Sequence, residues 1–224
     1  EEDAVDILAI CGSPRKNRTT HSMLQAVLDG AGLTNEILWP AFMKIGHCVG
    51  CRKCKNVTPG ECWQDDDMRA ALGKMYDARA LILASPTYFG NVPGPLKNFI
   101  DRSIPTCYTG KGEAWAGAAD HGTRPFKGRP AVILVASGGG DHEKTAATIR
   151  LVLQYYEYDV VGEYAEGMAG AIAKAEEIAG HVTLNKGERS NLAELADDLQ
   201  PFLRHARGAV HHQVGVRDLL VDLA

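Results

Sequence analysis

Two short apolar runs constrain the fold of this chain more than any other feature. The runs ARALILAS, at residues 78–85, and AVILVAS, at residues 131–137, are almost continuously aliphatic. Strands of this kind are buried on both faces, as in a parallel sheet that helices cover on each side. Patterns typical of helices lie between them, and alternating strands and helices form right-handed crossovers. The sequence therefore predicts an α/β fold with an open, doubly wound parallel sheet.

Three further strands and several helices complete this prediction. The strand YDVVGEYAEG is more polar than the others and is expected nearer an edge of the sheet. The acidic run 65–67 indicates a helix start, because acidic side chains cap free amides and suit the positive end of the helix dipole. The other strands are expected at 4–10 and 35–40, and the other helices near Thr20 and at 93–102, 142–156 and 191–207.

Composition excludes several classes of protein. The chain has 224 residues, of which 45% are hydrophobic and 23% charged, as in an ordinary globular domain. A net charge of −4 without a basic stripe argues against nucleic-acid binding. No apolar run approaches the ~20 residues of a membrane span, and the acidic start does not resemble a secretory signal. Because the cysteines are clustered rather than spread as a disulfide framework, we expect a reducing cytoplasm.

Two stretches exceed a minimal five-stranded unit. Residues 104–128 are rich in Gly, Ala and turn residues and form a predicted insertion before the fourth strand. Residues 209–224 form a predicted C-terminal helical tail. We therefore expect one domain over residues 1–208, followed by this tail.

Four cysteines form the most unusual motif of the chain, C-x2-C-x2-C-x7-C. Iron–sulfur clusters need several converging thiolates, and a tight C-x2-C-x2-C turn closed by a more distant cysteine provides them. Zinc sites instead pair two knuckles across a longer spacer. The spacing favours a cluster over zinc, and over unliganded surface thiols, which oxidise readily. The predicted ligands are Cys48, Cys51, Cys54 and Cys62.

The residues beside these cysteines allow two interpretations. Arg52, Lys53 and Lys55 would offset the negative charge of a cluster and attract an acidic electron-transfer partner, or they form an ordinary solvated turn. Trp63 either covers the cluster from water or packs in the usual way.

Other potential ligands carry weaker signals. Cys11 ends a buried strand and is expected to be a small core residue. Cys107 lies in the insertion and fits a plain loop position better than a fifth ligand. His205, His211 and His212 are irregularly spaced, so a metal site on them is not favoured.

Ligands of open α/β sheets bind outside the carboxyl ends of the strands, and the first such loop, CGSPRKNRTT, is suited to an anion. It offers hydroxyls, free helix amides and positive charge, and Gly12 is assigned to a tight turn. Neither the dinucleotide-binding pattern nor the P-loop pattern is met, so a monophosphate fits best. A capped turn without a ligand is the alternative. The candidate anion ligands are Ser13, Arg15, Thr19 and Thr20, with Arg18 as a further cation.

Two more strand ends carry loops suited to a ligand. After Ser85 and Pro86, the aromatic side chains of Tyr88 and Phe89 either pack on a flat ligand or belong to the core. In the run SGGGDHE, at residues 137–143, three glycines permit close approach of the backbone to a ligand. The three loops together indicate a binding site more strongly than any one of them alone.

The chain resembles the iron–sulfur flavoproteins of the NADPH-dependent FMN reductase superfamily, which have a flavodoxin-like fold. The resemblance extends over about residues 4–165 and rests on three motifs in the family's order. These are GSPRKNRTT at 12–20, the cysteine motif with DDDM at 48–68, and SPTYFGNVPGPLKNFIDR at 85–102. Arg18 departs from the family pattern, which often has Ser there.

The resemblance implies FMN and a 4Fe–4S cluster, the latter on the four cysteines of the 45–64 loop. It also implies a homodimer or homotetramer, for which the 104–128 insertion is a candidate contact. The residues that would bind FMN lie in the three loops: Ser13, Arg15, Asn17, Thr19, Thr20, Pro86, Thr87, Tyr88, Phe89, Gly90, Asn91, Ser137, Gly138 and Gly139.

These implications predict an oxidoreductase that moves electrons between a two-electron donor, such as NAD(P)H, and a one- or two-electron acceptor. Hydride would arrive at flavin N5 near Gly90 and Asn91, and no catalytic residue is assigned because the flavin carries the chemistry. Two alternatives stay open: a dedicated flavoenzyme that reduces one organic substrate, and a non-enzymatic redox sensor.

Overall fold

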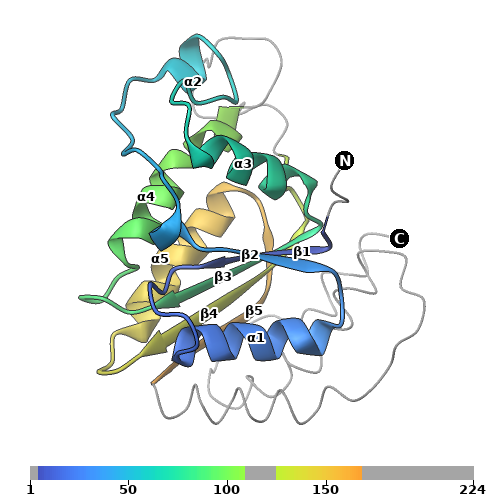
Figure 1. Cartoon of the computed structure of the whole chain (residues 1–224), viewed down its shortest axis with the longest axis vertical. Coiled ribbons are helices and arrows are strands. Elements are labelled where there is room, and N and C mark those ends of the chain that lie inside the picture. The colour runs from blue at the N-terminus through green and yellow to red at the C-terminus, as the bar shows by residue number, and fades with distance from the viewer. Residues whose placement is uncertain (1–4, 109–124, 168–224) are drawn as a thin grey trace.

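A single parallel sheet with helices on both faces forms the body of the protein (Figure 1). The structure is a computed structural model that describes residues 5–108 and 125–167. The strand order β2-β1-β3-β4-β5 is that of a flavodoxin-like fold, as predicted. The strands are β1 (Ile7–Cys11), β2 (Asn35–Leu38), β3 (Ala80–Pro86), β4 (Pro130–Ser137) and β5 (Asp159–Gly167).

Burial of the strands follows the sequence pattern. Every residue of β1, β3 and β4 is buried, which confirms the interpretation of the two aliphatic runs. Cys11 is fully buried at the end of β1 and is a core residue, as predicted. The more polar β5 lies at one edge of the sheet, where most of its residues keep partial exposure to solvent.

The helices cover the two faces unequally. In the described residues, α1 packs against the face formed by Ile7 and Ala9, whereas α3, α4 and α5 pack against the face formed by Leu8 and Ile10 (Figure 1). Alternate side chains of one strand point to opposite faces, so β1 contributes to both cores. The long helices are α1 (Thr19–Ala31), α3 (Asp67–Asp77), α4 (Gly94–Arg102) and α5 (His142–Tyr155).

Three short helical elements are absent from the sequence prediction: η1 (Pro40–Phe42), α2 (Lys53–Asn56) and η2 (Ile104–Tyr108). The first residues of the predicted insertion form η2, which buries Cys107 instead of leaving it in a loop. At the other end of the insertion, Phe126 is fully buried, with its ring 5.6 Å from Tyr76 and 4.9 Å from Tyr158. Both ends of the insertion are therefore anchored in the core.

Several predictions fall outside the described residues. They are the helix at 191–207, the histidines 205, 211 and 212, the tail at 209–224, and the division between tail and domain. Within the described part of the chain, no helix has the length and apolar character needed to cross a membrane.

Candidate functional site

Three loops meet at the carboxyl ends of β1, β3 and β4. The amide of Gly12 donates a hydrogen bond of 2.7 Å to the Ala84 carbonyl, which ties the first loop to β3. A Cβ on Gly90 would lie 3.6 Å from Cβ of Asp141, so the second and third loops are also neighbours. The strand order reverses beside β1, between β1 and β3, and such a switch point is where ligands of open α/β sheets bind.

Gly12 has a different role from the predicted one. Its φ is not in the left-handed region, so the turn does not require glycine. A Cβ at this position would lie 2.6 Å from Cδ2 and 3.1 Å from Cβ of Leu96, and 3.3 Å from the Ala84 carbonyl oxygen. Gly12 is therefore required because α4 packs directly onto the first loop, a contact between distant segments that the sequence pattern does not reveal.

The N-terminus of α1 is left open for an anion. Its N-cap residue is Arg18, whose side chain makes no capping hydrogen bond, and no acidic residue lies in the first turn. The amides of Thr19 and Thr20 have no acceptor in the described part of the chain. Unpaired amides at the positive end of a helix dipole form a ready phosphate site.

The first loop is shaped by its own hydrogen bonds. The Ser13 hydroxyl, which is almost fully buried, accepts from the Arg15 amide at 3.2 Å. Asn17 adopts a left-handed φ of 57°, and its amide donates to Nδ1 of His21 at 3.0 Å. This fold of the loop leaves the side chains of Arg15 and Arg18 exposed at its surface.

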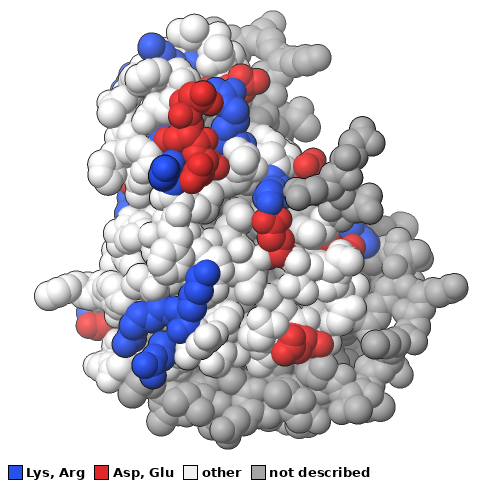
Figure 2. Space-filling view, viewed as in Figure 1, with Lys and Arg blue, Asp and Glu red and all other residues white. Residues whose placement is uncertain are grey.

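A basic and aromatic wall, not anticipated from the sequence, stands beside this loop. Nζ of Lys16 lies 5.3 Å from the ring centre of Trp39 and 5.1 Å from that of Phe42. The His21 ring packs edge-on against Trp39 at 5.0 Å, and burial together with the charge of Lys16 lowers the pKa of His21. Figure 2 shows Lys and Arg side chains gathered over this end of α1. The wall adds positive charge around the candidate phosphate site.

The second loop is a tight turn with an exposed aromatic tip. Tyr88 and Asn91 exchange backbone hydrogen bonds of 2.8 and 3.1 Å, while Phe89 and Gly90 both have positive φ. Phe89 is fully exposed and Tyr88 is 42% exposed, so the alternative that placed both aromatics in the core is wrong. The Asn91 amide donates to the Tyr88 carbonyl within the turn, whereas the Gly90 amide has no acceptor among the described residues.

One polar group at the base of the second loop lacks a protein partner, and the third loop is open beside it. The Thr87 hydroxyl is buried and makes no hydrogen bond within the described chain. A Cβ added to Gly138 or Gly139 would meet nothing within 4 Å. The neighbouring Ser137 hydroxyl accepts from the Gly139 amide at 3.3 Å and so fixes the glycine turn. An unpaired buried hydroxyl is costly, and a polar ligand at this position would satisfy it.

The four cysteines of the motif line one cavity of about 420 Å³, whose wall includes Arg102 at the C-terminal end of α4. Arg52, Lys55 and the half-exposed Trp63 also line it, whereas Lys53 lies over the Trp63 ring at 4.6 Å. The full set of cysteines in the lining is Cys48, Cys51, Cys54 and Cys62.

The thiols differ in their electrostatic environment. Burial, followed by the negative charges of the other three cysteines, raises the pKa of Cys54. A hydrogen bond from the Lys53 amide is the main cause that lowers the pKa of the exposed Cys51. Within residues 5–108 and 125–167, no three His, Cys, Asp or Glu side chains converge closely enough to hold a single metal ion. The cysteines thus surround a cavity and do not meet at one point.

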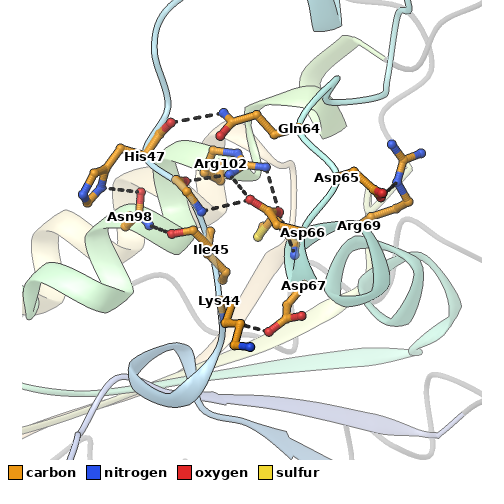
Figure 3. Close-up of polar contacts among 12 residues, drawn as sticks. Lys44, Ile45, His47, Gln64, Asp65, Asp66, Asp67, Arg69, Asn98 and Arg102 are labelled. Carbon is orange, nitrogen blue, oxygen red and sulfur yellow. Dashed lines mark hydrogen bonds and ion pairs between the residues drawn. The ribbon is translucent and has the colours of Figure 1, made fainter.

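An ion pair between the buried Arg102 and the partly buried Asp66 fastens the base of the cysteine loop (Figure 3). Nη1 and Nη2 of Arg102, which is 1% exposed, donate to the two carboxylate oxygens of Asp66 at 2.7 and 3.0 Å. Nη1 also donates to the Gly46 carbonyl at 2.6 Å, and the Gly46 amide donates back to Asp66 at 2.9 Å. Asp66 also caps α3 by accepting from the Met68 amide. One carboxylate therefore joins both ends of the loop to α4.

Further hydrogen bonds close the same base. The Lys44 amide donates to Asp67 at 2.6 Å, and the Asn98 side chain donates to the Ile45 carbonyl at 2.9 Å (Figure 3). The Gln64 side chain donates to the His47 carbonyl at 3.1 Å. The sequence identified Asp66 as a helix cap and Arg102 as part of a motif, but the pair itself joins residues 36 positions apart and was missed.

Comparison with known proteins identifies the family. The sequence model of NADPH-dependent FMN reductase matches residues 5–170. The chain therefore belongs to the NADPH-dependent FMN reductase family, as the three motifs indicated, and so to the flavin-dependent oxidoreductases.

The relatives point in the same direction. An iron-sulfur flavoprotein of Archaeoglobus fulgidus is 35% identical over 165 residues, which cover 71% of this chain and 67% of that protein. A second iron-sulfur flavoprotein of the same organism is 42% identical over 100 residues, covering 43% and 48%. The chain thus spans between about half and two thirds of the length of these relatives.

Solved structures share the fold. The NAD(P)H:quinone oxidoreductase of Methanothermobacter marburgensis superposes with a TM-score of 0.54 at 18% identity, over 95% of this chain and 99% of that one. At this level of identity the likeness concerns the flavodoxin-like fold alone.

Proposed function

We propose that this protein is an FMN- and 4Fe–4S-containing oxidoreductase that passes electrons between a two-electron donor such as NAD(P)H and a one- or two-electron acceptor. The observation that carries the proposal is the position of α4. Its first residue, Gly94, follows the second loop, and its last residue, Arg102, lines the cysteine cavity. Nine helical residues span roughly 13 Å, so one short helix separates the two sites.

The residues at the three loops fit FMN. The open N-terminus of α1, with Ser13, Asn17, Thr19 and Thr20, would hold the phosphate, and Arg15 would add charge. The buried Thr87 hydroxyl would find its partner on the ribityl chain or the ring. Bound FMN supplies the redox chemistry, while the chain positions it and excludes water from one face.

The cavity suits an iron–sulfur cluster. The four thiols line one space, and each iron of a cubane cluster takes its own thiolate. The family membership and the names of the relatives favour the same cofactor. Arg52 and Lys55 would offset part of the negative charge of the bound cluster.

The proposed separate roles of the flavin and the cluster are tested by Cys54→Ala under anaerobic conditions. We expect the variant to bind FMN and to be reduced by NAD(P)H, because no residue of the phosphate loop lines the cysteine cavity. It should lose the iron and pass electrons more slowly to a one-electron protein acceptor such as a cytochrome. Cys11→Ala is the control, since Cys11 is buried in the core and lies outside the cavity lining. Unchanged one-electron transfer in Cys54→Ala would contradict the proposal.

Assembly and location belong to the same proposal. The exposed Phe89 and the open second loop suit a homodimer or homotetramer in which a second copy covers the flavin. The basic residues 52, 53 and 55 suit an acidic protein partner. Sedimentation measurements would test the homo-oligomer. The salt dependence of electron transfer would test the acidic protein partner. A cytoplasmic location remains a prediction from the cysteine pattern.

A further inference from the structure

We propose that Arg102 is the electrostatic partner of the iron–sulfur cluster: its Nε–H donates to a cluster or thiolate sulfur, and its charge, balanced by Asp66, sets the reduction potential. This inference rests on the proposed cluster. It gives a further role to Arg102, the last residue of α4 (Figure 3).

The hydrogen bonds of Arg102 leave one donor unused. Nη1 and Nη2 are committed to Asp66 and to the Gly46 carbonyl. Nε is buried and has no acceptor in the described part of the chain. A buried donor on a charged group that lacks a partner is costly and rare in native proteins. An acceptor is therefore expected next to Nε, and Arg102 forms part of the lining of the cysteine cavity.

The surroundings of Arg102 identify the acceptor as sulfur. Cys62 shares the cavity wall with Arg102. A guanidinium remains charged in proteins, and hydrogen bonds to cluster or thiolate sulfur are among the factors that set cluster potentials.

The sign of the effect follows from charge. Each electron that enters the cluster adds one negative charge, which a fixed guanidinium stabilises, so Arg102 raises the potential. Asp66 opposes this effect, because its carboxylate partly neutralises the same guanidinium. Burial strengthens both contributions, since charges interact more strongly away from water. Removing either partner weakens the same loop base, yet the two changes should shift the potential in opposite directions.

The test compares Arg102→Gln, Arg102→Lys and Asp66→Asn in the full chain, purified anaerobically. The cluster potential is measured by a redox titration followed by electron paramagnetic resonance, and iron, sulfide and FMN are quantified in each sample. We expect Arg102→Gln to weaken the electron affinity of the cluster at least tenfold, which is about 59 mV for a one-electron couple. Arg102→Lys keeps the charge and loses the planar donor, so its shift should be negative and smaller.

Asp66→Asn should shift the potential in the positive direction while keeping a competent helix cap. Arg150→Gln is the matched control, because Arg150 also pairs with a carboxylate, at 2.8 Å from Glu163, but lies outside the cavity lining. It should leave the cluster potential unchanged.

The outcomes separate this inference from the proposed function. Wild-type protein without iron and sulfide would overturn both. If the Arg102 variants leave the cluster potential unchanged, or if Asp66→Asn shifts it in the same negative direction as they do, the inference alone is overturned. Arg102 would then have only a structural role. If Arg102→Gln does not retain the cluster, the signs of the shifts in Arg102→Lys and Asp66→Asn decide.

Discussion

The three flavin loops and the base of the cysteine loop satisfy their polar groups in opposite ways. On the flavin side, the first turn of α1 is uncapped, the Thr87 hydroxyl is unpaired and the aromatic tip at Phe89 is exposed. At the base of the cysteine loop, Asp66 caps α3 and pairs with Arg102. Both sites are built from loops that follow strands of the same parallel sheet, so the contrast does not come from the fold.

This contrast separates groups reserved for a ligand from groups that hold the scaffold. An open helix N-terminus is tolerable on the surface, because water replaces the missing ligand. The buried guanidinium of Arg102 needs the partly buried carboxylate of Asp66, because leaving a buried charge without its partner is costly. The cysteine loop therefore has a base fastened by the protein itself and a tip whose thiols line the cavity.

The largest expected effect comes from breaking the base. Asp66→Ala removes the helix cap and leaves the buried Arg102 without its counter-ion, which should cost about 3–5 kcal/mol of unfolding free energy. Chemical denaturation of the protein without cluster measures it. Asp65→Ala is the control, since Asp65 is exposed and its ion pair with Arg69 at 3.5 Å should contribute under about 1 kcal/mol. Equal losses in the two variants would show that the base is not fastened by Asp66.

The flavin side should respond in ligand binding and not in stability. Arg15→Gln should weaken FMN binding about tenfold to a hundredfold, because a hydrogen bond to a charged group contributes about 1.5–3 kcal/mol. Fluorescence quenching of free FMN during reconstitution measures the affinity. Arg69→Gln, an exposed change on α3, should leave it unaltered. An unchanged affinity in Arg15→Gln would remove Arg15 from the phosphate site.

Gly12 lies where the first loop packs against α4. The lack of a side chain at this position should matter more than its backbone flexibility. Gly12→Ala forces a methyl group against Leu96 and the Ala84 carbonyl, and overpacking of this kind costs about 1–3 kcal/mol. Gly73→Ala provides the opposite sign, because Gly73 has open space and lies within α3, where alanine stabilises by about 0.5–1 kcal/mol. Thermal unfolding of the two variants tests both directions. A neutral Gly12→Ala would contradict the close packing.

The smallest expected effect is a pH dependence at the phosphate loop. Burial and Lys16 lower the pKa of His21 in the folded protein, so the unfolded chain binds the proton more readily. The stability that neutral His21 contributes should be present above about pH 6.5 and be lost as the pH falls through the lower folded-state pKa. Nuclear magnetic resonance of the ring protons reports this pKa. A value above 6.5 would reverse the sign.

The strands and long helices of the described residues were predictable because their signals are local. The aliphatic runs of β3 and β4 and the acidic start of α3 each lie within one short stretch of sequence. The convergence of the four cysteines on one cavity also followed from their spacing.

The missed features all depend on contacts between distant segments. The pair of Asp66 with Arg102, the packing of Leu96 on Gly12, and the approach of Lys16 to Trp39 arise only when the chain is folded. None of these residue types is unusual at its position in the sequence, so no local pattern could have indicated the contact. The residues assigned to FMN and to the cluster remain predictions at the level of individual ligands.

The cofactor content of anaerobically purified protein shows whether α4 separates a flavin site from a cluster site. We expect one FMN and about four irons with matching sulfide per chain. In Cys54→Ala we expect full retention of FMN with loss of the iron. Zinc in place of iron, or the loss of FMN together with the iron, would contradict this separation of a flavin from a cluster.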